Sequence, residues 1–549
     1  MDIILTFPGG KTVQVPAGCT IESMLSHFGG DTSKIYAVRV NNAITSLSKT
    51  IEVNAELEPV YAGTADGSAI YRRTLCFVLG AAAQKLFPNS RLLVGHSLGY
   101  GYYYTLDTGK PLSEEDLGKL KSEMKSIISS DKTISTAVIS YKDAITLLEK
   151  QNMIQTRKLL NYVSKPQIVI NKLDDFADIY FAPLLKSTGM LSVFDIMPYH
   201  EGFLLRFPAT STPDKLPEFK DSPGLFTVYK RYKEWGKLQN ITSVASLNEL
   251  VYNRKTRDFI DITESFLNKN IADIADKIHE RGNVKVVLLA GPSSSGKTTT
   301  SKKLAIQLKV LGYTPHVISL DNYYVDRTRT PRDENGDFDY ECLEALDIEQ
   351  LNDNLVDLFA GKPVKLPSYD FKEGKQYYNK PELVLGKSDI LVMEGIHGLN
   401  DKLTPLIKPE NKFKVYLSAL TQLNLDDQNR ISTSDNRLIR RIVRDSQFRG
   451  KSASETIQMW PSVQRGERLH IFPFQNNADV MLNTALDYEL AVLRTYAAPL
   501  LRCVTPFERE YAEASRLLQF LSNFYTIPAT YVPGQSIIRE FIGGSDFKY

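Results

Sequence analysis

The stretch VVLLAGPSSSGKTTTSKKLAIQLK, from Val286 to Lys309, decides the fold of the second half of this 549-residue chain. Its first five residues form a continuous apolar run that predicts a buried strand, and the residues from Lys297 onward predict a helix. The pattern G-x-x-x-x-G-K-[ST] lies between them, carried by Gly291, Gly296, Lys297 and Thr298. Between a strand and a helix, that pattern indicates a loop that wraps a nucleotide phosphate.

The residue types of this loop suit phosphate binding. Glycines let backbone N–H groups turn inward around the phosphates, and the following helix adds the positive end of its dipole. We expect Lys297 to neutralise charge on the β- and γ-phosphates and the Thr298 hydroxyl to bind Mg²⁺, so the predicted cofactors are ATP and Mg²⁺. The residues predicted to contact the nucleotide are Gly291, Pro292, Ser293, Ser294, Ser295, Gly296, Lys297, Thr298 and Thr299.

The residues around the loop predict an α/β domain. From Val284 onward, apolar strand-like runs alternate with helical segments, which is typical of a parallel sheet covered by helices on both faces. Two of these runs end in a carboxylate, Asp321 in VISLDNYY and Glu394 in DILVMEG. We expect both strands to flank the strand of the loop. Asp321 could then take a proton from an attacking hydroxyl, and Glu394 could complete the Mg²⁺ shell.

A row of arginines follows further along the chain. Arg437, Arg440, Arg441 and Arg444 are spaced i, i+3, i+4 and i+7, which places four guanidinium groups on one face of a helix. Guanidinium forks match phosphate oxygens geometrically. The alternative is a solvated basic face, but beside a phosphate loop the row predicts a lid that closes over the transferred group.

Residues 284 to about 490 resemble the uridine kinase and phosphoribulokinase family of P-loop kinases. The matching segments, in family order, are GPSSSGKTT, LDNYY, DFDYECLEALD, PSYDF, MEGI and RRIVRDSQFRG. The resemblance implies that Asp321 is the catalytic base, assisted by Lys297, Arg441 and Arg444, and that Glu394 helps Thr298 to hold Mg²⁺. It further implies a nucleotide contact for Arg449 and an acceptor site formed by Asp321, Tyr324, Asp339, Tyr369 and Arg441.

One position departs from this family. Uridine kinases carry a base-reading histidine five residues after the tyrosine of their Y-D-F motif, and this chain has Gly374 there. Losing an imidazole removes a directional hydrogen bond to the base. We therefore expect a broader or shifted base preference, unless a nearby side chain such as Lys372 or Gln376 reaches into the site.

The first half resembles the N-terminal part of threonyl-tRNA synthetases. Residues 1–62 resemble the TGS domain, a β-grasp module, and residues 63–225 resemble the α+β editing domain that follows it, through segments such as GSAIYRRTLCFVLGAAAQKLFP and GYGYYYTLD. The editing family has H-x-x-x-H on its first helix, where this chain has Phe77 and Ala81. Neither side chain can transfer a proton, so we expect the editing-like domain to be catalytically silent.

The remaining segments complete the expected organisation. Residues 226–282 predict a helical connector, with Ile271, Ile274 and Ile278 on one apolar stripe. Residues 283–490 form the kinase-like domain, and residues 491–549 a helical segment and a tail to which the sequence assigns no role. No apolar run reaches membrane-spanning length, and the scattered Cys19, Cys76, Cys342 and Cys503 fit a reducing cytoplasm, which is the expected location.

These observations favour an ATP-dependent kinase acting on a small-molecule nucleoside, uridine or cytidine first, at its 5′-hydroxyl. Two alternatives stay open: a kinase for another small alcohol or a sugar phosphate, and an RNA-associated switch protein in which nucleotide hydrolysis controls the synthetase-like half. The net charge of +2 does not force nucleic-acid or membrane binding. RNA binding by the N-terminal half and self-association stay open.

Overall fold

The computed structural model describes residues 2–109, 112–334 and 336–548. The N-terminal end forms a five-stranded sheet in the order β2-β1-β7-β4-β5. Its neighbours β1 and β7 run parallel, and the other pairs are antiparallel. The strands are β1 (Asp2–Thr6), β2 (Thr12–Pro16), β4 (Ile35–Val40), β5 (Ala43–Ser46) and β7 (Ala55–Tyr61). Alternate residues of β1 and β7 are buried in one small core, as a period-two apolar pattern predicts.

Two helices and two antiparallel sheets make up the next region. Helices α1 (Ala65–Leu86) and α2 (Glu114–Ser129) pack together, and the Ser113 side chain caps α2 by accepting the N–H of Asp116. A four-stranded sheet has the order β13-β14-β9-β8 and a three-stranded one the order β10-β11-β12. Their strands are β8 (Arg91–Ser97), β9 (Gly101–Asp107), β10 (Ser135–Ser140), β11 (Gln167–Leu173), β12 (Phe176–Asp178), β13 (Asp195–Tyr199) and β14 (Gly202–Arg206). Helices α3 (Tyr141–Lys150) and α4 (Ile154–Leu160) lie between β10 and β11 in the sequence.

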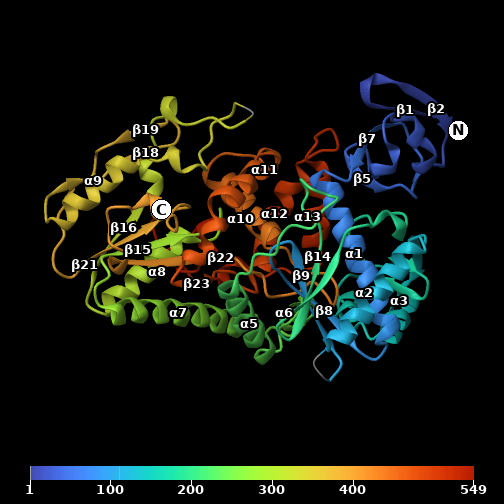
Figure 1. Ribbon diagram of the computed structural model, residues 1–549, viewed down its shortest axis with the longest axis horizontal. Coiled ribbons are helices and arrows are strands. Elements are labelled where there is room, and N and C mark those ends of the chain that lie inside the picture. Colours follow the sequence, from blue (N-terminus) through green and yellow to red (C-terminus); the bar gives the residue numbers. More distant parts are fainter. Residues whose placement is uncertain (1, 110–111, 335, 549) are drawn as a thin grey trace.

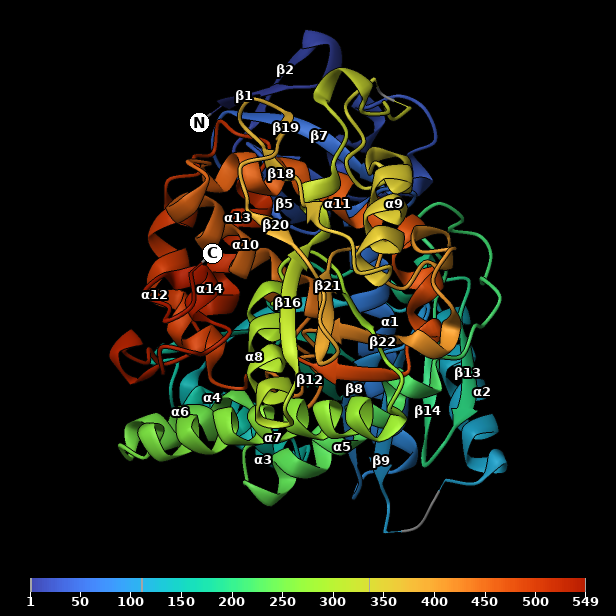
Figure 2. The ribbon, with the colours of Figure 1, turned by 90° about the vertical axis from the view of Figure 1, so that its left-hand side faces the viewer.

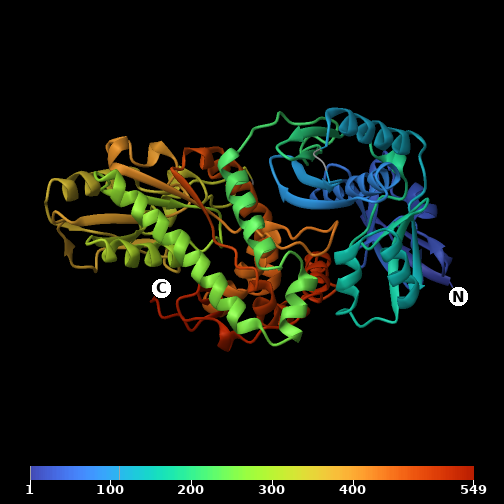
Figure 3. The same ribbon diagram turned by 90° about the horizontal axis from the view of Figure 1, so that it is seen from below.

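Three helices connect this region to the second half of the chain: α5 (Pro223–Leu238), α6 (Val244–Tyr252) and α7 (Thr256–Arg281). The predicted apolar stripe of α7 is confirmed, because Ile271, Ile274 and Ile278 belong to the largest hydrophobic core. Figure 3 shows α7 as a long diagonal helix beneath the second half, where it packs against α8 (Lys297–Val310). The connector is therefore part of the core rather than a free linker.

The second half is built on a five-stranded, all-parallel sheet in the order β16-β21-β15-β22-β23. The strands are β15 (Val286–Ala290), β16 (Thr314–Ser319), β21 (Asp389–Glu394), β22 (Lys412–Ser418) and β23 (Val480–Asn483). Helices around it include α9 (Ile348–Phe359), α10 (Thr433–Phe448), α11 (Ala453–His470) and α12 (Glu489–Arg502). The predicted α/β class is confirmed. The prediction that the strands before Asp321 and Glu394 both flank the loop strand was wrong. Strand β21, which ends at Glu394, is a neighbour of β15, whereas β16, which precedes Asp321, pairs with β21 and lies one strand further out.

The chain ends inside this half. Helix α13 (Tyr511–Leu521) packs against α12, and the short α14 (Arg539–Ile542) packs against α10. Ile537, Ile538 and Phe541 are fully buried, so the last segment contributes to the core. Figure 2 shows α14 and the C-terminal end beside α8. No helix in the described ranges is both long enough and apolar enough to cross a membrane.

The two halves meet through the loop of residues 419–432, which joins β22 to α10. The Asp427 carboxylate accepts hydrogen bonds from Arg91 Nη2 at 2.8 Å and from the backbone N–H of Thr156 at 3.0 Å. The Asn424 side-chain amide donates to the carbonyl oxygen of Val94 at 2.7 Å. Figure 1 shows the two halves side by side, with α10, α12 and α13 between them. We call residues 419–432 the junction loop.

Candidate active site

Side chains from outside the phosphate loop of residues 291–298 anchor the carbonyl groups of its backbone. The carbonyl oxygens of Ser293, Ser294 and Ser295 accept hydrogen bonds from Arg437 (3.1 Å), Arg440 (3.1 Å) and the Thr484 hydroxyl (2.6 Å), respectively. In a planar trans peptide the next N–H points away from the carbonyl. Anchoring these carbonyls therefore directs the following amide groups toward the inside of the loop, where a phosphate binds.

Two glycines of the loop meet different steric demands. A Cβ at Gly291 would lie 2.3 Å from the carbonyl oxygen of Leu417 on the neighbouring strand, so no side chain fits there. Gly296 has φ +78°, in the left-handed region, and begins α8. A Cβ there would also lie 2.6 Å from Ile537 Cγ2 of the C-terminal segment. The G-x-x-x-x-G spacing thus follows from backbone packing as well as from phosphate binding.

Lys297 and Thr298 occupy the first turn of α8. The Lys297 ammonium group lies across the loop, donating to the carbonyl oxygens of Gly291 (3.0 Å) and Pro292 (3.2 Å). The Thr298 hydroxyl donates to Glu394 Oε1 at 3.1 Å. Glu394 is the last residue of β21, as predicted. A hydroxyl and a carboxylate that converge in this way supply hard oxygen ligands, the donor set that suits Mg²⁺ shared with substrate phosphates. The residues therefore fit the predicted metal.

Asp321 lies in the short turn directly after β16, close to this group. Its half-buried position raises the pKa of its carboxyl through desolvation, while Lys297, Arg449 and Arg444 act in the opposite direction. Glu394 has its pKa raised to about 7, mainly by burial and then by the nearby Asp321. The two strand-end carboxylates are therefore close enough to interact, although their strands are not both neighbours of the loop strand.

Helix α10 divides its arginines between two roles. Arg437 and Arg440 are buried in ion pairs with Glu467 and Glu489, and they also brace the loop carbonyls described above. Glu467 Oε1 in addition accepts the backbone N–H of Ser293 at 3.0 Å. Arg437 and Arg440, which were predicted to belong to a closing lid, are therefore fixed supports of the loop. Their charges are neutralised inside the core, where an unpaired arginine would be costly.

The other arginines surround Asp445, which is completely buried. Arg444 donates to Asp445 Oδ1 from Nε (3.0 Å) and Nη2 (2.9 Å), Arg441 Nε lies 3.2 Å from Oδ2, and Arg449 Nη1 lies 3.6 Å from Oδ1. Arg441 also donates to the hydroxyl of Ser293 at 2.8 Å, which connects this group to the loop. Burial opposes the charge of Asp445, but the three arginines outweigh it and hold its pKa below the usual value.

An aromatic cluster lies close to Asp321, because burial and then the charge of Asp321 raise the pKa of the Tyr324 hydroxyl. The rings of Tyr324 and Tyr369 are 5.6 Å apart, and that of Phe371, which is 57% exposed, lies 5.8 Å and 5.0 Å from them. The Tyr324 hydroxyl donates to the Tyr340 carbonyl oxygen at 3.0 Å, whereas the buried Tyr369 hydroxyl has no partner among the described residues. Asp339 accepts the backbone N–H of Glu341, so its carboxylate helps to shape the segment.

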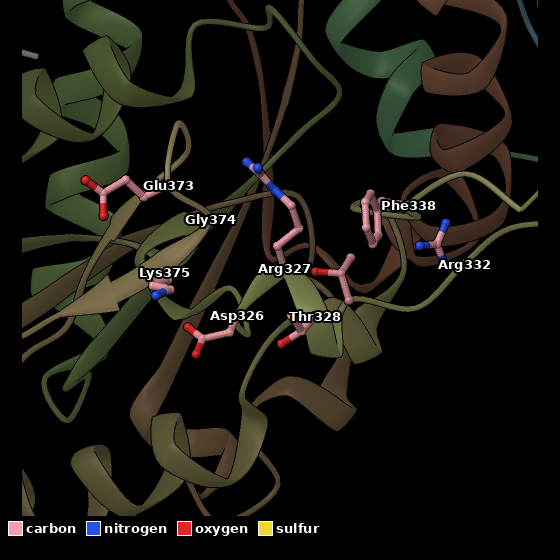
Figure 4. A pocket seen from close by; sticks show the side chains of 9 residues that line it. Asp326, Arg327, Thr328, Arg332, Phe338, Glu373, Gly374 and Lys375 are labelled. Atoms are coloured by element: carbon pink, nitrogen blue, oxygen red, sulfur yellow. The ribbon is translucent and has the colours of Figure 1, made fainter.

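A cavity of about 480 Å³ lies beside the hairpin that carries Tyr369, although none of the three rings of the cluster lines it. Its lining includes Arg327, Thr330, Phe338 and Gly374, and Figure 4 shows the Arg327 side chain rising between Phe338 and the turn at Gly374. This turn joins β18 (Ser368–Asp370) to β19 (Lys375–Tyr377). Gly374 has φ +71°, and a Cβ there would lie 2.8 Å from Arg327 Nε. Glycine is therefore required at 374, and an arginine fills the space beside it.

The geometry is that of a P-loop phosphotransferase, and residues 286–491 match the family model described as "Phosphoribulokinase / Uridine kinase family". The sequence resemblance over this region is confirmed. Among solved structures, a possible uridine kinase from Bacillus stearothermophilus is 24% identical, with 42% of this chain and 100% of that chain covered and a TM-score of 0.24. A D-glycerate 3-kinase from Cryptococcus neoformans is 15% identical, with coverage of 47% and 87% and a TM-score of 0.22.

The other resemblance, to threonyl-tRNA synthetases, is also confirmed. The threonine–tRNA ligase of Acetivibrio thermocellus is 28% identical over 197 residues, which are 36% of this chain and 31% of that enzyme. Threonine–tRNA ligase 2 of Bacillus subtilis is 29% identical over 194 residues, 35% of this chain and 30% of that enzyme. The chain spans about a third of the length of these relatives.

Several residues of the site were missed at the sequence level. Asp445, Glu467, Arg327 and Glu540 carry charges that act on the loop or on the acceptor cavity. Glu467 lies 174 positions from Ser293 in the sequence and Glu540 lies 241 positions from Thr299, so no local pattern connects them. Asp445 could have been found from the sequence, because it directly follows Arg444 at the end of the arginine row.

Proposed function

We propose that this protein transfers the γ-phosphoryl group of ATP, bound with Mg²⁺, to the 5′-hydroxyl of a nucleoside, with uridine and cytidine as the first candidates. The observation that carries the proposal is the position of Asp321. Its carboxylate is close enough to Lys297 and Arg444 for their charges to act on it, and it acts in turn on Tyr324, whose ring forms an aromatic cluster with Tyr369 and Phe371. A base between a phosphate loop and an aromatic surface suits an alcohol attached to a planar ring.

Each group has a defined part in this reaction. Asp321 accepts the proton of the attacking hydroxyl, and Lys297 and the arginines held by Asp445 stabilise the charge that spreads over the phosphoryl oxygens. Arg437 and Arg440 keep the loop in shape. Thr298 and Glu394 hold Mg²⁺, which supplies charge neutralisation when it is bound. Phosphoryl transfer depends mainly on positioning and on electrostatics, and this chain provides both from fixed elements.

The aromatic surface favours a nucleoside over a sugar phosphate as acceptor. Phe371 and Phe338 are 57% and 36% exposed. Phe338 lines the cavity, and a nucleobase can stack on exposed rings of this kind. A sugar phosphate has no planar apolar face to cover these rings.

The test is transfer of labelled γ-phosphate from ATP-Mg²⁺ to a panel of nucleosides, sugar phosphates and other small alcohols, using the full chain. We expect 5′-phosphorylation of a pyrimidine nucleoside that is lost in Lys297→Ala and in Asp321→Asn. Transfer to a sugar phosphate or to another alcohol alone would overturn the nucleoside assignment and keep the kinase. Hydrolysis that RNA stimulates and no acceptor affects would overturn both.

A further inference from the structure

The C-terminal tail, residues 532–548, forms a wall of the phosphate loop. Ser536, Ile537 and Ile538 are fully buried, and Ile537 Cγ2 closes over Gly296 where the loop enters α8. The guanidinium of Arg539 donates to the carbonyl oxygens of Ala529 (2.9 Å) and Val532 (2.6 Å), which fixes the turn before α14. The tail backbone is therefore held in place against the loop.

From this wall the tail presents a carboxylate to the phosphate-binding end of α8. Glu540 Oε2 accepts the hydroxyl of Thr299 at 2.6 Å and the backbone N–H of Thr299 at 3.2 Å. Thr299 is completely buried in the first turn of the helix. Backbone N–H groups at this end of a phosphate-loop helix are the donors that hold nucleotide phosphates. A carboxylate oxygen thus occupies the place of a phosphate oxygen.

We propose that Glu540 is a resident anion of the phosphate loop, which the donor nucleotide must displace, so that its charge weakens nucleotide binding. This inference rests on the proposed function, because it assumes that the loop binds a nucleotide. A carboxylate and a phosphate repel each other and compete for the same two donors. Since the tail backbone is fixed and the Glu540 side chain is only half-buried, rotation of the side chain is enough to release Thr299.

The same contact gives the first turn of α8 a negative partner from within the chain. The positive end of the α8 dipole and the orphan N–H groups of its first turn favour a negative partner. Glu540 supplies that partner from within the chain. It also adds negative charge near Glu394, whose raised pKa has Glu540 among its causes. The charge of Glu540 therefore stabilises the empty loop and opposes its occupation.

The experiment measures the dissociation constants of ADP and of a non-hydrolysable ATP analogue, each with Mg²⁺, by calorimetry on the full chain. Glu540→Gln keeps the size of the side chain and one carbonyl oxygen but removes the charge, and we expect about tenfold tighter binding. Glu540→Ala is the second variant, with the same expectation, in case the glutamine also occupies the donors. Asp546→Asn, on the exposed end of the same tail, is the matched control and should bind like the unmodified chain.

The outcomes separate the two proposals. Unchanged or weaker nucleotide binding in both Glu540 variants, with the unmodified chain binding normally, would overturn the displacement. Failure of the unmodified chain to bind any nucleotide would instead overturn the proposed function. If the variants bind more tightly but the control does so equally, general tail charge rather than the contact with Thr299 is responsible, and the proposal is also lost.

Discussion

Arg327 fills the space beside Gly374, the position where the family that this region resembles has a base-reading histidine. Its Nη2 donates to the carbonyl oxygens of Phe371 (2.7 Å) and Lys372 (3.2 Å), and this arrangement places the guanidinium against the cavity. The two side chains that the sequence suggested for this place, Lys372 and Gln376, do not reach the cavity. Lys372 is exposed and does not line the cavity, and the Gln376 side chain donates to the Tyr324 carbonyl oxygen. If the acceptor is a nucleoside, as proposed above, we therefore expect Arg327 to be the group that contacts its base.

A guanidinium only donates hydrogen bonds, so it can recognise the acceptor groups of a base but not its donor groups. It can bind the carbonyl oxygens of uracil but has no acceptor for the exocyclic amino group of cytosine. We expect uridine to be preferred over cytidine in kcat/KM, and Arg327→Ala to reduce that preference by about tenfold. Lys372→Ala is the control and should leave the ratio unchanged. An unaltered ratio in Arg327→Ala would show that another group reads the base.

The sequence predicts single residues well where local spacing controls their position. The glycines, Lys297 and Thr298 follow from a loop that must turn between a strand and a helix, and Glu394 follows from the end of an apolar run. Arg327 could not be found in this way. Its role depends on the left-handed turn at Gly374, which brings a distant hairpin against it.

At the scale of the element, α10 shows how one arginine-rich helix combines two functions. Periodicity correctly places the arginines on one helix, but it cannot tell which of them meet a buried acid. Glu467 and Glu489, from α11 and α12, neutralise Arg437 and Arg440. Asp445, on α10 itself, instead gathers Arg441, Arg444 and Arg449, of which Arg441 contacts Ser293 of the phosphate loop. The acids therefore determine which arginines are structural.

This division makes Asp445 a positioning residue with a testable effect. In Asp445→Asn the three guanidinium groups lose the charge that holds them together, and they repel one another. We expect kcat to fall by about 10²-fold while the dissociation constant of ADP changes much less, because the arginines act on charge that develops during transfer. Single-turnover kinetics and calorimetry give the two quantities separately.

Asp435→Asn is the matched control for this helix. Asp435 lies in the first turn of α10 and pairs with Arg516 of α13, at 2.8 Å, so it carries the same charge without a contact to the three arginines. Its kcat should stay close to that of the unmodified chain. An equal loss of kcat in both variants would mean that Asp445 only supports the fold of the helix.

At the scale of the whole molecule, the junction loop ties the kinase domain to the synthetase-like half. The side chain of Phe77, on α1, is completely buried. Its ring packs against those of Phe176 and Tyr180, at centroid distances of 5.2 Å and 5.6 Å. A Cβ at Gly80 would lie 3.2 Å from Gln428 of the junction loop. Where the editing family has histidines, this chain has packed side chains beside its own loop, which supports the prediction that the domain is catalytically silent.

The arrangement also suggests what this half does for the kinase. The junction loop leads directly into α10, so its anchors at Arg91, Val94 and Thr156 hold the start of the arginine helix. The sequence resemblances describe each half separately and contain no information about this contact. It arises from Asp427 and Asn424, which belong to no recognised motif.

Two buried acids make this junction sensitive to pH. Asp178, at the end of β12, has its pKa raised well above the usual value by burial and then by Asp426. Burial likewise raises the pKa of Asp426, in the junction loop, to about 7, against the hydrogen bonds that Asn429 donates to it. Both side chains are at most 1% exposed. An unfolded chain releases these protons near pH 4.

Between about pH 4 and pH 7 the folded protein therefore binds more protons than the unfolded chain, and its stability falls as the pH rises. We expect the melting temperature to be lower at pH 8 than at pH 5, and Asp178→Asn to reduce that difference by about 3 °C or more, because one of the two charges is no longer forced into the junction. Differential scanning calorimetry of the full chain at both pH values measures this. Asp174→Asn is the control, because Asp174 is exposed in the turn before β12 and pairs with Lys132. If raising the pH from 5 to 8 lowers the melting temperature of Asp178→Asn as much as that of the control, the pH dependence arises elsewhere in the molecule.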